Sequence, residues 1–171
     1  MIETHRLLLR RWRTDDRPFV GAILGDPDVM HFSDRGPLSE TDQAVWFENA
    51  VVSERSDWSL GVLAIEGKRD GRIIGYISLS NDVGRVGTGD AELGVRLAKH
   101  AWGRGYATEA VLGMIDAAEG MTRAHRIVAI VDPHNNPSVR VLEKAGMIKK
   151  GDLVLAGYDY PDHLYVRELR H

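Results

Sequence analysis

Apolar residues along this chain recur with two periods, one typical of helices and one typical of strands. A first helix is predicted within TDDRPFVGAIL (14–24), where a Thr/Asp cap precedes a helical apolar pattern. A second helix is predicted over 39–54, where Ser39, followed by Asp42 and Gln43, resembles a capping arrangement. A third helix is predicted from the helical spacing of six apolar residues, Ala107, Ala110, Val111, Met114, Ile115 and Ala118.

Strand-like runs fill much of the rest of the chain. The tetrapeptide KRDG (68–71) makes a good tight turn between two of them. The run at 126–131 is apolar on both faces, which indicates a central, buried strand. The last two runs can pair as a hairpin. The predicted strands are 6–12, 58–66, 72–80, 90–98, 126–131, 147–156 and 163–169.

The order of these elements predicts the fold class. NNPSVRVLEKAG (135–146) combines a start signal, Asn before Pro, with a late lysine and a terminal glycine, so a short helix is expected there. The centre of the chain is strand, loop, helix, strand, a connection that is usually parallel and right-handed. We predict one α+β domain over 1–171, with a mostly antiparallel sheet, one parallel strand pair and about four flanking helices.

Composition narrows the classes of function. The chain has 171 residues, 43% of them hydrophobic, which suits one domain with an ordinary core. Its net charge of -3 argues against a nucleic-acid or membrane surface. No apolar run approaches the roughly 20 residues that span a bilayer, and the N-terminus does not resemble a signal peptide. A cytoplasmic protein is the expectation.

The absence of cysteine limits the chemistry further. It excludes disulfides, a cysteine nucleophile and thiolate metal sites. The chain has seven histidines, but the HEXXH motif is absent. We therefore expect no metal centre.

The stretch HAWGRGYATEA (100–110) is the strongest candidate for a binding loop. Gly103 and Gly105 lack a Cβ, so their amides can approach a ligand closely and adopt a positive φ. The helix that follows directs its free N–H groups into this loop, and Arg104 adds a positive charge. These features fit a phosphate or pyrophosphate site. The alternatives are a simple hinge and a surface arginine; the loop is neither a P-loop nor a complete dinucleotide fingerprint.

The surrounding motifs make a family resemblance specific. The order AELGVRL, WGRGYATEA, helix, RIVAIVD and NNPSVRVLEKAGM resembles the acyl-CoA-binding half of the GNAT superfamily of N-acetyltransferases. ETHRLLLRRW, WGRGYATEA and NXXSXXVLEKXG resemble the branch of ribosomal-protein N-terminal acetyltransferases. The likeness covers nearly the whole chain; it is strongest over 90–148 and looser over 13–57, where the substrate usually binds. Trp102 stands where the superfamily often has Gln or Arg, as is common in that branch.

The resemblance implies acetyl-CoA as the cofactor, with its pyrophosphate on the amides of Gly103 to Ala107. It also implies a bulge at Gly94 that splays the two parallel strands, so that backbone groups of Val95 and Leu97 bind the pantetheine arm. Asn135 resembles the family asparagine that contacts this arm, whereas Asn136 is predicted to be the helix N-cap. The predicted cofactor-binding residues are Val95, Leu97, Trp102, Gly103, Arg104, Gly105, Tyr106, Ala107, Thr108 and Asn135.

Two residues are predicted to be catalytic. Alternation over 90–98 places Glu92, Gly94 and Arg96 on one face of the strand. An amine acceptor is mostly protonated at neutral pH, so a base must remove its proton, and Glu92 is our candidate. The resemblance implies that Ser138 protonates the departing thiolate. The alternative for Glu92 is a solvated glutamate on the strand face. The alternative for Ser138 is a hydroxyl that hydrogen-bonds the backbone at the start of the helix.

Other side chains were weighed for the same site. His134, Trp102, Tyr106 and Tyr158 are candidates for lining the cleft and equally for packing or surface positions. Trp46 and Phe47 fall on the apolar face of the second helix, which is more often core than acceptor site.

These features lead to an enzyme hypothesis and to two alternatives. The first is direct acetyl transfer from acetyl-CoA to a primary amine, a protein N-terminus or a small amine, with both substrates bound together. The alternatives are a non-catalytic acyl-CoA sensor and another kind of nucleotide-binding protein. The acceptor is left open. Dimers are common in the family, so the resemblance is compatible with a homodimer.

Overall fold

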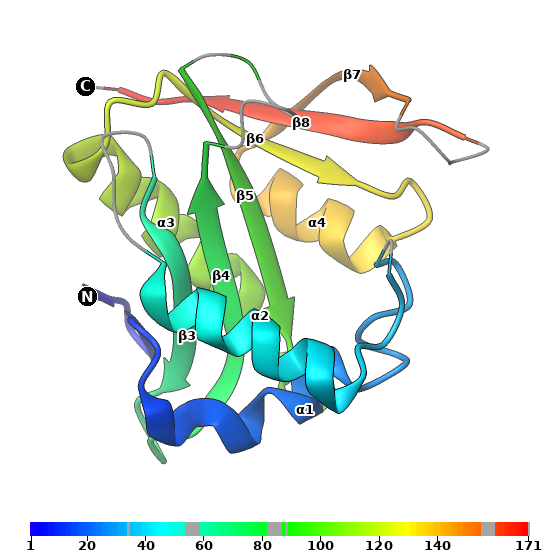
Figure 1. The fold of residues 1–171 in the computed structure, drawn as a ribbon. Coiled ribbons are helices and arrows are strands. Elements are labelled where there is room, and N and C mark those ends of the chain that lie inside the picture. Colours follow the sequence, from blue (N-terminus) through cyan, green and yellow to red (C-terminus); the bar gives the residue numbers. More distant parts are fainter. Residues whose placement is uncertain (34, 54–58, 82–86, 88, 155–159, 171) are drawn as a thin grey trace.

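The computed structural model describes residues 1–33, 35–53, 59–81, 87, 89–154 and 160–170; Tyr158, weighed above for the cleft, lies outside them. The described strands form one eight-stranded sheet in the order β1-β2-β3-β4-β5-β6-β8-β7 (Figure 1). The bounds are β1 Ile2–Glu3, β2 Leu7–Arg10, β3 Gly61–Gly67, β4 Ile73–Ser80, β5 Asp90–Leu97, β6 Arg126–Val131, β7 Ile148–Leu153 and β8 Asp162–Glu168.

Strand pairing confirms the predicted fold class. β5 and β6 are parallel, and the other neighbouring strands are antiparallel. Each predicted strand overlaps an observed one, with ends that differ by at most three residues. The predicted turn connects β3 to β4 and ends on Gly71, whose φ of 68° is the left-handed conformation that such turns require. The sequence analysis missed β1, which is only two residues long.

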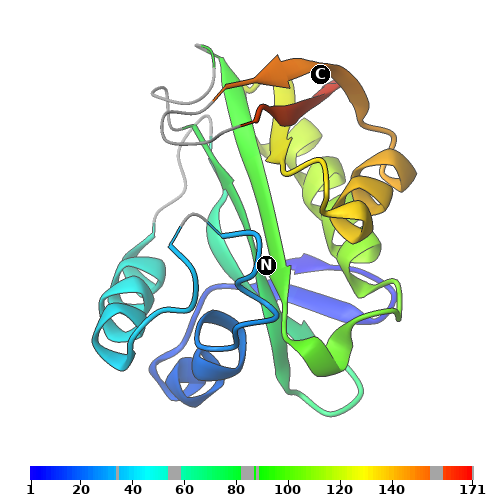
Figure 2. The ribbon, with the colours of Figure 1, turned by 90° about the vertical axis from the view of Figure 1, so that its right-hand side faces the viewer.

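Helices cover both faces of the sheet (Figure 2). One pair lies on each side, α1 with α2 and α3 with α4. In the described part of the chain, no helix is long and apolar enough to cross a membrane. The bounds are α1 Gly21–Leu24, α2 Glu40–Val52, α3 Tyr106–Met121 and α4 Asn136–Lys144, with 3-10 turns η1 Thr14–Phe19 and η2 Lys99–Ala101.

The first predicted helix is only partly correct. The segment forms η1, which contains Pro18, and then the four-residue α1. Its N-cap is Arg13 rather than a Thr or Asp, and the Arg13 backbone N–H donates to Asp16 at 2.7 Å. The carboxylate that accepts from the start of this turn therefore belongs to Asp16, a residue within the turn. Asp16 also pairs with a buried arginine.

That arginine, Arg10, fixes the segment to the sheet. It is 6% exposed. Its guanidinium donates to Asp16 at 2.7 and 2.8 Å and to Glu66 of β3 at 2.5 Å. Because a buried charge without a partner is costly, this network positions the chain that leads into α1.

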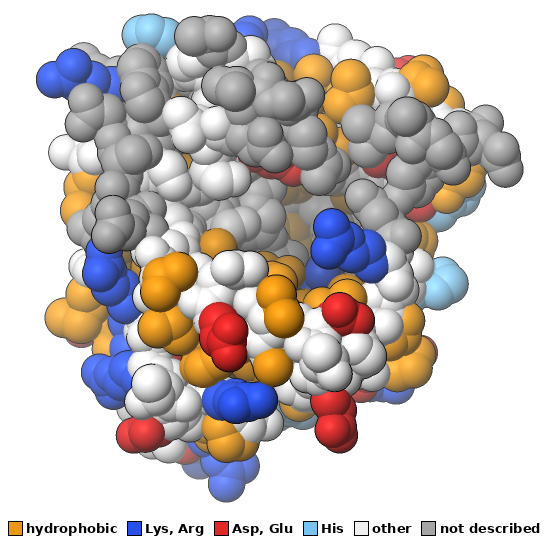
Figure 3. All heavy atoms as spheres, viewed as in Figure 1, with side chains coloured by type: hydrophobic (Ala, Val, Ile, Leu, Met, Phe, Trp, Pro, Cys, Tyr) orange, Lys and Arg blue, Asp and Glu red, His pale blue; other side chains and the backbone are white. Residues whose placement is uncertain are grey.

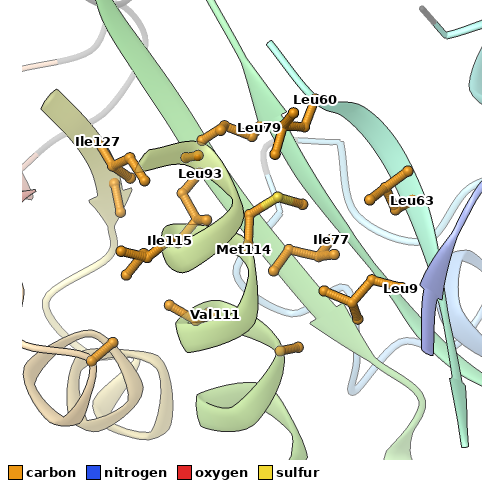
Figure 4. Close-up of a cluster of buried hydrophobic side chains, with 14 of the residues drawn as sticks. Leu9, Leu60, Leu63, Ile77, Leu79, Leu93, Val111, Met114, Ile115 and Ile127 are labelled. Carbon is orange, nitrogen blue, oxygen red and sulfur yellow. The ribbon is translucent and has the colours of Figure 1, made fainter. Parts of the chain in front are cut away.

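The main core lies between α3 and the sheet (Figure 4). Val111, Met114 and Ile115 of α3 are fully buried, as their helical spacing predicted. They pack against residues that strands of the sheet direct toward this face, including Leu9, Leu63, Ile77, Leu93 and Ile127.

A second, aromatic cluster fills the opposite face. Trp12 packs edge-on against Trp46 and Phe47 of α2, with ring centroids 5.6 Å apart in both pairs. Phe47 is 5% exposed, which confirms its prediction as core. Trp46 is half-buried and extends the cluster to Tyr76 of β4, 4.8 Å away. The surface on the α2 side carries hydrophobic, acidic and basic side chains intermingled (Figure 3).

Candidate active site

The parallel pair β5 and β6 opens into a gap. The strands are paired only from Asp90–Arg126 to Glu92–Val128, and they diverge beyond that point (Figure 1). An ion pair clamps the closed end: Arg126 donates to the buried Asp90 at 2.9 and 2.6 Å. No described strand therefore lies beside β5 from Leu93 to Leu97 on its β6 side.

Backbone direction makes this free edge of β5 a polar one. The N–H of Ala98 donates to Ile74 of β4 at 2.9 Å. Because backbone polar groups of alternate residues point to opposite sides of a strand, Val95 and Leu97 direct theirs into the gap. The Trp102 indole already donates to the Leu97 carbonyl at 2.9 Å. The N–H of Leu97 and both backbone groups of Val95 can meet an extended ligand.

The bulge expected at Gly94 is absent. Pairing between β4 and β5 continues in one register from Gly75–Leu97 to Ser80–Glu92. A Cβ at Gly94 would stand 3.0 Å from the Ser78 hydroxyl, so the glycine serves a close approach across the strands. β5 and β6 therefore separate without a bulge, and their separation begins after Glu92, the last β5 residue that pairs with β6.

The glycine loop has the geometry that an anion site needs. Gly103 and Gly105 have φ values of 71° and 76°, a region that residues with a side chain rarely adopt. Gly105 is the N-cap of α3 and provides no side-chain acceptor for the first turn. The first N–H groups of α3, from Tyr106 onward, can therefore donate to a ligand. A loop that served only as a hinge would not require free N–H groups at the start of α3.

A brace that the sequence analysis missed holds the loop. Arg6 donates from Nη1 to the Arg104 carbonyl at 2.9 Å and stacks over the Tyr106 ring at 4.5 Å. Glu109, in the first turn of α3, accepts from Arg6 N, Arg6 Nε and Thr4 Oγ1, each at 2.6 Å. The sequence contains both partners, Arg6 in ETHR and Glu109 in ATEA, but 103 residues separate them.

The brace depends on the charge of Glu109. Burial by itself would raise the pKa of Glu109, but hydrogen bonds from Thr4 and Arg6 outweigh it and hold that pKa below its ordinary value of 4.5. The carboxylate is thus more stable in the folded chain than in the unfolded one.

We expect Glu109→Gln to lower the free energy of unfolding by about 1–3 kcal/mol, because the amide leaves donors without an acceptor. Urea unfolding at neutral pH measures this, with Asp116→Asn on the exposed face of α3 as the control. Since the folded pKa is lowered, the wild-type advantage is complete above about pH 4.5 and is lost as the pH falls through the folded value. A pH-independent difference would contradict this account.

Glu92 lies at the point where the strands part. It is the last β5 residue paired with β6, opposite Val128, and it faces Ser80 of β4. It is half-buried. By strand alternation its side chain shares a face with Arg96, away from the α3 core.

Ser138 lies on the segment that follows β6, the other strand of the parallel pair. It lies in the first turn of α4, which follows β6 after a short loop. Its backbone N–H donates to Oδ1 of Asn135 at 3.2 Å. Asn135, and not Asn136 as predicted, is therefore the N-cap, and its side-chain oxygen accepts from the first turn of α4. Pro137 has no N–H, so the cap reaches the next donor, on Ser138.

A polar cluster closes the loop between β6 and α4. Asp132 accepts from the Tyr160 hydroxyl at 2.7 Å and contacts His134 Nδ1 at 3.0 Å. Burial alone would raise the pKa of Asp132, but hydrogen bonds from Tyr160 and His134 lower it. His134 itself is exposed, so of the cleft candidates it is a rim residue. Among the described residues, no group of three His, Asp or Glu side chains could hold a metal.

A groove of about 830 Å³ starts at the loop and runs along α3. Its lining includes Gly105, Thr108 and Leu112, together with Thr4 and Lys144 of α4. It is distinct from the gap between β5 and β6, but the loop borders both.

Comparisons with known proteins point the same way. The model of the acetyltransferase (GNAT) domain family matches residues 6–148. The uncharacterized N-acetyltransferase p20 of Bacillus licheniformis is 28% identical over 151 residues, 86% of this chain and 82% of that protein.

Solved structures match the fold across the whole domain. A GNAT-family acetyltransferase from Bacillus anthracis has a TM-score of 0.84 at 24% identity, with 98% of this chain and 97% of that chain covered. Spermidine N-acetyltransferase from Vibrio cholerae, solved in complex with CoA and spermine, has a TM-score of 0.75 at 19% identity and 95% coverage of each chain. At these identities the likeness concerns the fold.

Proposed function

Because this chain belongs to the acetyltransferase (GNAT) domain family and is an acetyltransferase, we propose that it moves the acetyl group of acetyl-CoA directly to a primary amine. One observation carries this proposal: the gap between β5 and β6 leads to an uncapped helix N-terminus that follows two left-handed glycines. An extended thioester arm and an anionic group at its end fit these two features together.

Acetyl-CoA would bind along this path. Its pyrophosphate accepts from the amides of Gly103 to Ala107, with Arg104 as the cation within the loop and Thr108 in the first turn of α3. The pantetheine arm lies against the free edge of β5 and meets Val95 and the Leu97 N–H. The relative from Vibrio cholerae, which was solved with CoA, supports this choice of cofactor. Trp102 and Tyr106 would shape the loop through the contacts described above.

The chemistry then needs two proton transfers. Glu92 takes a proton from the ammonium of the acceptor, directly or through water, and the neutral nitrogen attacks the thioester carbonyl. The C–N bond forms and the C–S bond breaks. Ser138 passes a proton to the CoA thiolate and takes up the second proton that the former amine nitrogen loses, so that the amide and the CoA thiol leave and the serine hydroxyl is restored. Holding both substrates in line along β5 supplies much of the rate.

The branch and the acceptor belong to this proposal as well. The ETHR segment, which the resemblance drew on, forms the brace to the loop, and this supports kinship with the ribosomal-protein N-terminal acetyltransferases. An α-amine is the acceptor that this kinship favours. A non-catalytic acyl-CoA sensor would have no need of Glu92 at the point where the strands part.

Binding of acetyl-CoA is the first test. Acetyl-CoA should raise the melting temperature, by mass action on the folded state, and free adenosine should raise it much less because it lacks the pyrophosphate. Stabilisation by NAD or ATP without stabilisation by CoA would contradict the proposal.

A further inference from the structure

Arg96 shares a face of β5 with Glu92, the proposed base. It lies on β5, four residues after Glu92 and on the same face of the strand. Gly94 stands between them and has no side chain to separate them. Arg96 is half-buried, and its Nη1 donates to the Tyr76 hydroxyl and approaches the Met30 sulfur, each at 3.2 Å.

Among the described residues Arg96 forms no ion pair. Its two polar contacts, a phenol and a thioether, are neutral. A half-buried guanidinium has five N–H donors and keeps its charge, so it normally faces a carboxylate. Three other arginines of the domain do so: Arg6 with Glu109, Arg10 with Asp16 and Arg126 with Asp90.

Tyr76 completes a pair of donors. Burial raises the pKa of Tyr76, although Arg96 opposes this, so the phenol stays protonated at neutral pH. Its oxygen accepts from Arg96, which leaves the hydroxyl hydrogen to donate elsewhere. Trp46 packs on the Tyr76 ring at 4.8 Å and forms an apolar wall beside this polar pair.

We infer that Arg96, with Tyr76, binds a carboxylate of the acceptor, and that the acceptor is an amino acid or short peptide with a free carboxyl group. This inference rests on the proposed function, since Glu92 must receive the amine at the other end. The Cα atoms of Glu92 and Arg96 are about 13 Å apart along the strand. A molecule with an amine and a carboxylate can bridge the two.

The charge of Arg96 also selects against other amines. A polyamine would bring a second positive charge next to the Arg96 guanidinium, which pairs with no acid among the described residues, and the like charges repel. Spermidine should therefore be a poor acceptor for this chain. A peptide whose carboxyl terminus is amidated should lose the contact with Arg96.

Matched acceptors test the inference. Acetyl-CoA-dependent thiol release is measured with amino acids and dipeptides, each beside its C-terminal amide, and with spermidine. The free acids should exceed their amides about 10- to 100-fold in kcat/KM, the range for a charged hydrogen bond. Amidation lowers the pKa of the amine and makes more of it neutral, so the chemistry alone would favour the amide.

Variants locate the preference. Arg96→Gln should raise KM for the acid, leave kcat nearly unchanged and abolish the preference for acid over amide. Arg96→Lys should restore it in part, because it keeps the charge but not the fork of donors. Melting with acetyl-CoA shows whether each variant is folded. Wild-type protein that used acid and amide equally, or that preferred spermidine, would overturn the inference and leave acetyl transfer standing. So would an unchanged preference in folded Arg96→Gln. Thiol release that no amine increases, with acetyl-CoA bound, would instead refute the proposed function and the inference with it.

Discussion

Glu92→Gln is expected to lower kcat by about 10²- to 10⁴-fold while acetyl-CoA affinity stays nearly the same, because general acid–base groups contribute in that range. The amide keeps the size of the side chain but cannot accept a proton as a carboxylate does. The rate of this variant should recover in part at high pH, where more of the acceptor amine is already neutral.

Ser138→Ala provides the comparison. It should also lower kcat, but a higher pH should not rescue it, because a more basic solution does not replace a lost proton donor. Profiles of kcat against pH for both variants, with one acceptor, separate the two roles. Unchanged rates in both variants would mean that water and orientation suffice, and both catalytic assignments would be withdrawn.

Gly105→Val is expected to weaken acetyl-CoA binding by more than tenfold. Its φ of 76° is a genuine outlier for a β-branched residue, and strain of this kind costs about 1–3 kcal/mol. An added Cβ would also stand 3.5 Å from Arg6 Nη2, so the new side chain would press on the brace that holds the loop. Isothermal titration with acetyl-CoA measures the effect.

Gly71→Val is the matched control. Gly71 has a φ of 68° in the turn between β3 and β4, and a Cβ there would meet no atom within 4 Å. This variant should lose similar stability and bind acetyl-CoA normally. Equal acetyl-CoA affinities in the two variants would indicate that the glycine loop is a simple hinge.

Local patterns in the sequence predicted most of the fold. The helical spacing behind Ala107 and the doubly apolar run at 126–131 each reported on burial of their own segment, and the structure has both elements there. The first helix was harder to predict, because the Asp16 carboxylate binds the Arg10 guanidinium as well as the backbone of its own segment. A local cap pattern cannot register such a tertiary partner.

The candidate site was predictable where it depends on backbone conformation. Gly103 and Gly105 have the positive φ values that their sequence suggested. The brace between Arg6 and Glu109 was not predictable, because neither residue looks unusual beside its neighbours in the chain. Asn135 shows a third case: the cap was predicted at Asn136, directly before Pro137, but the folded loop places Asn135 at the N-cap.

Two-substrate initial rates test the central claim most directly. Thiol release is measured with wild-type protein while acetyl-CoA and one acceptor amine are varied together. Direct transfer in a ternary complex predicts double-reciprocal lines that intersect, with one acetylated amine formed for each thiol released. Parallel lines, or thiol release that does not depend on the amine, would contradict it.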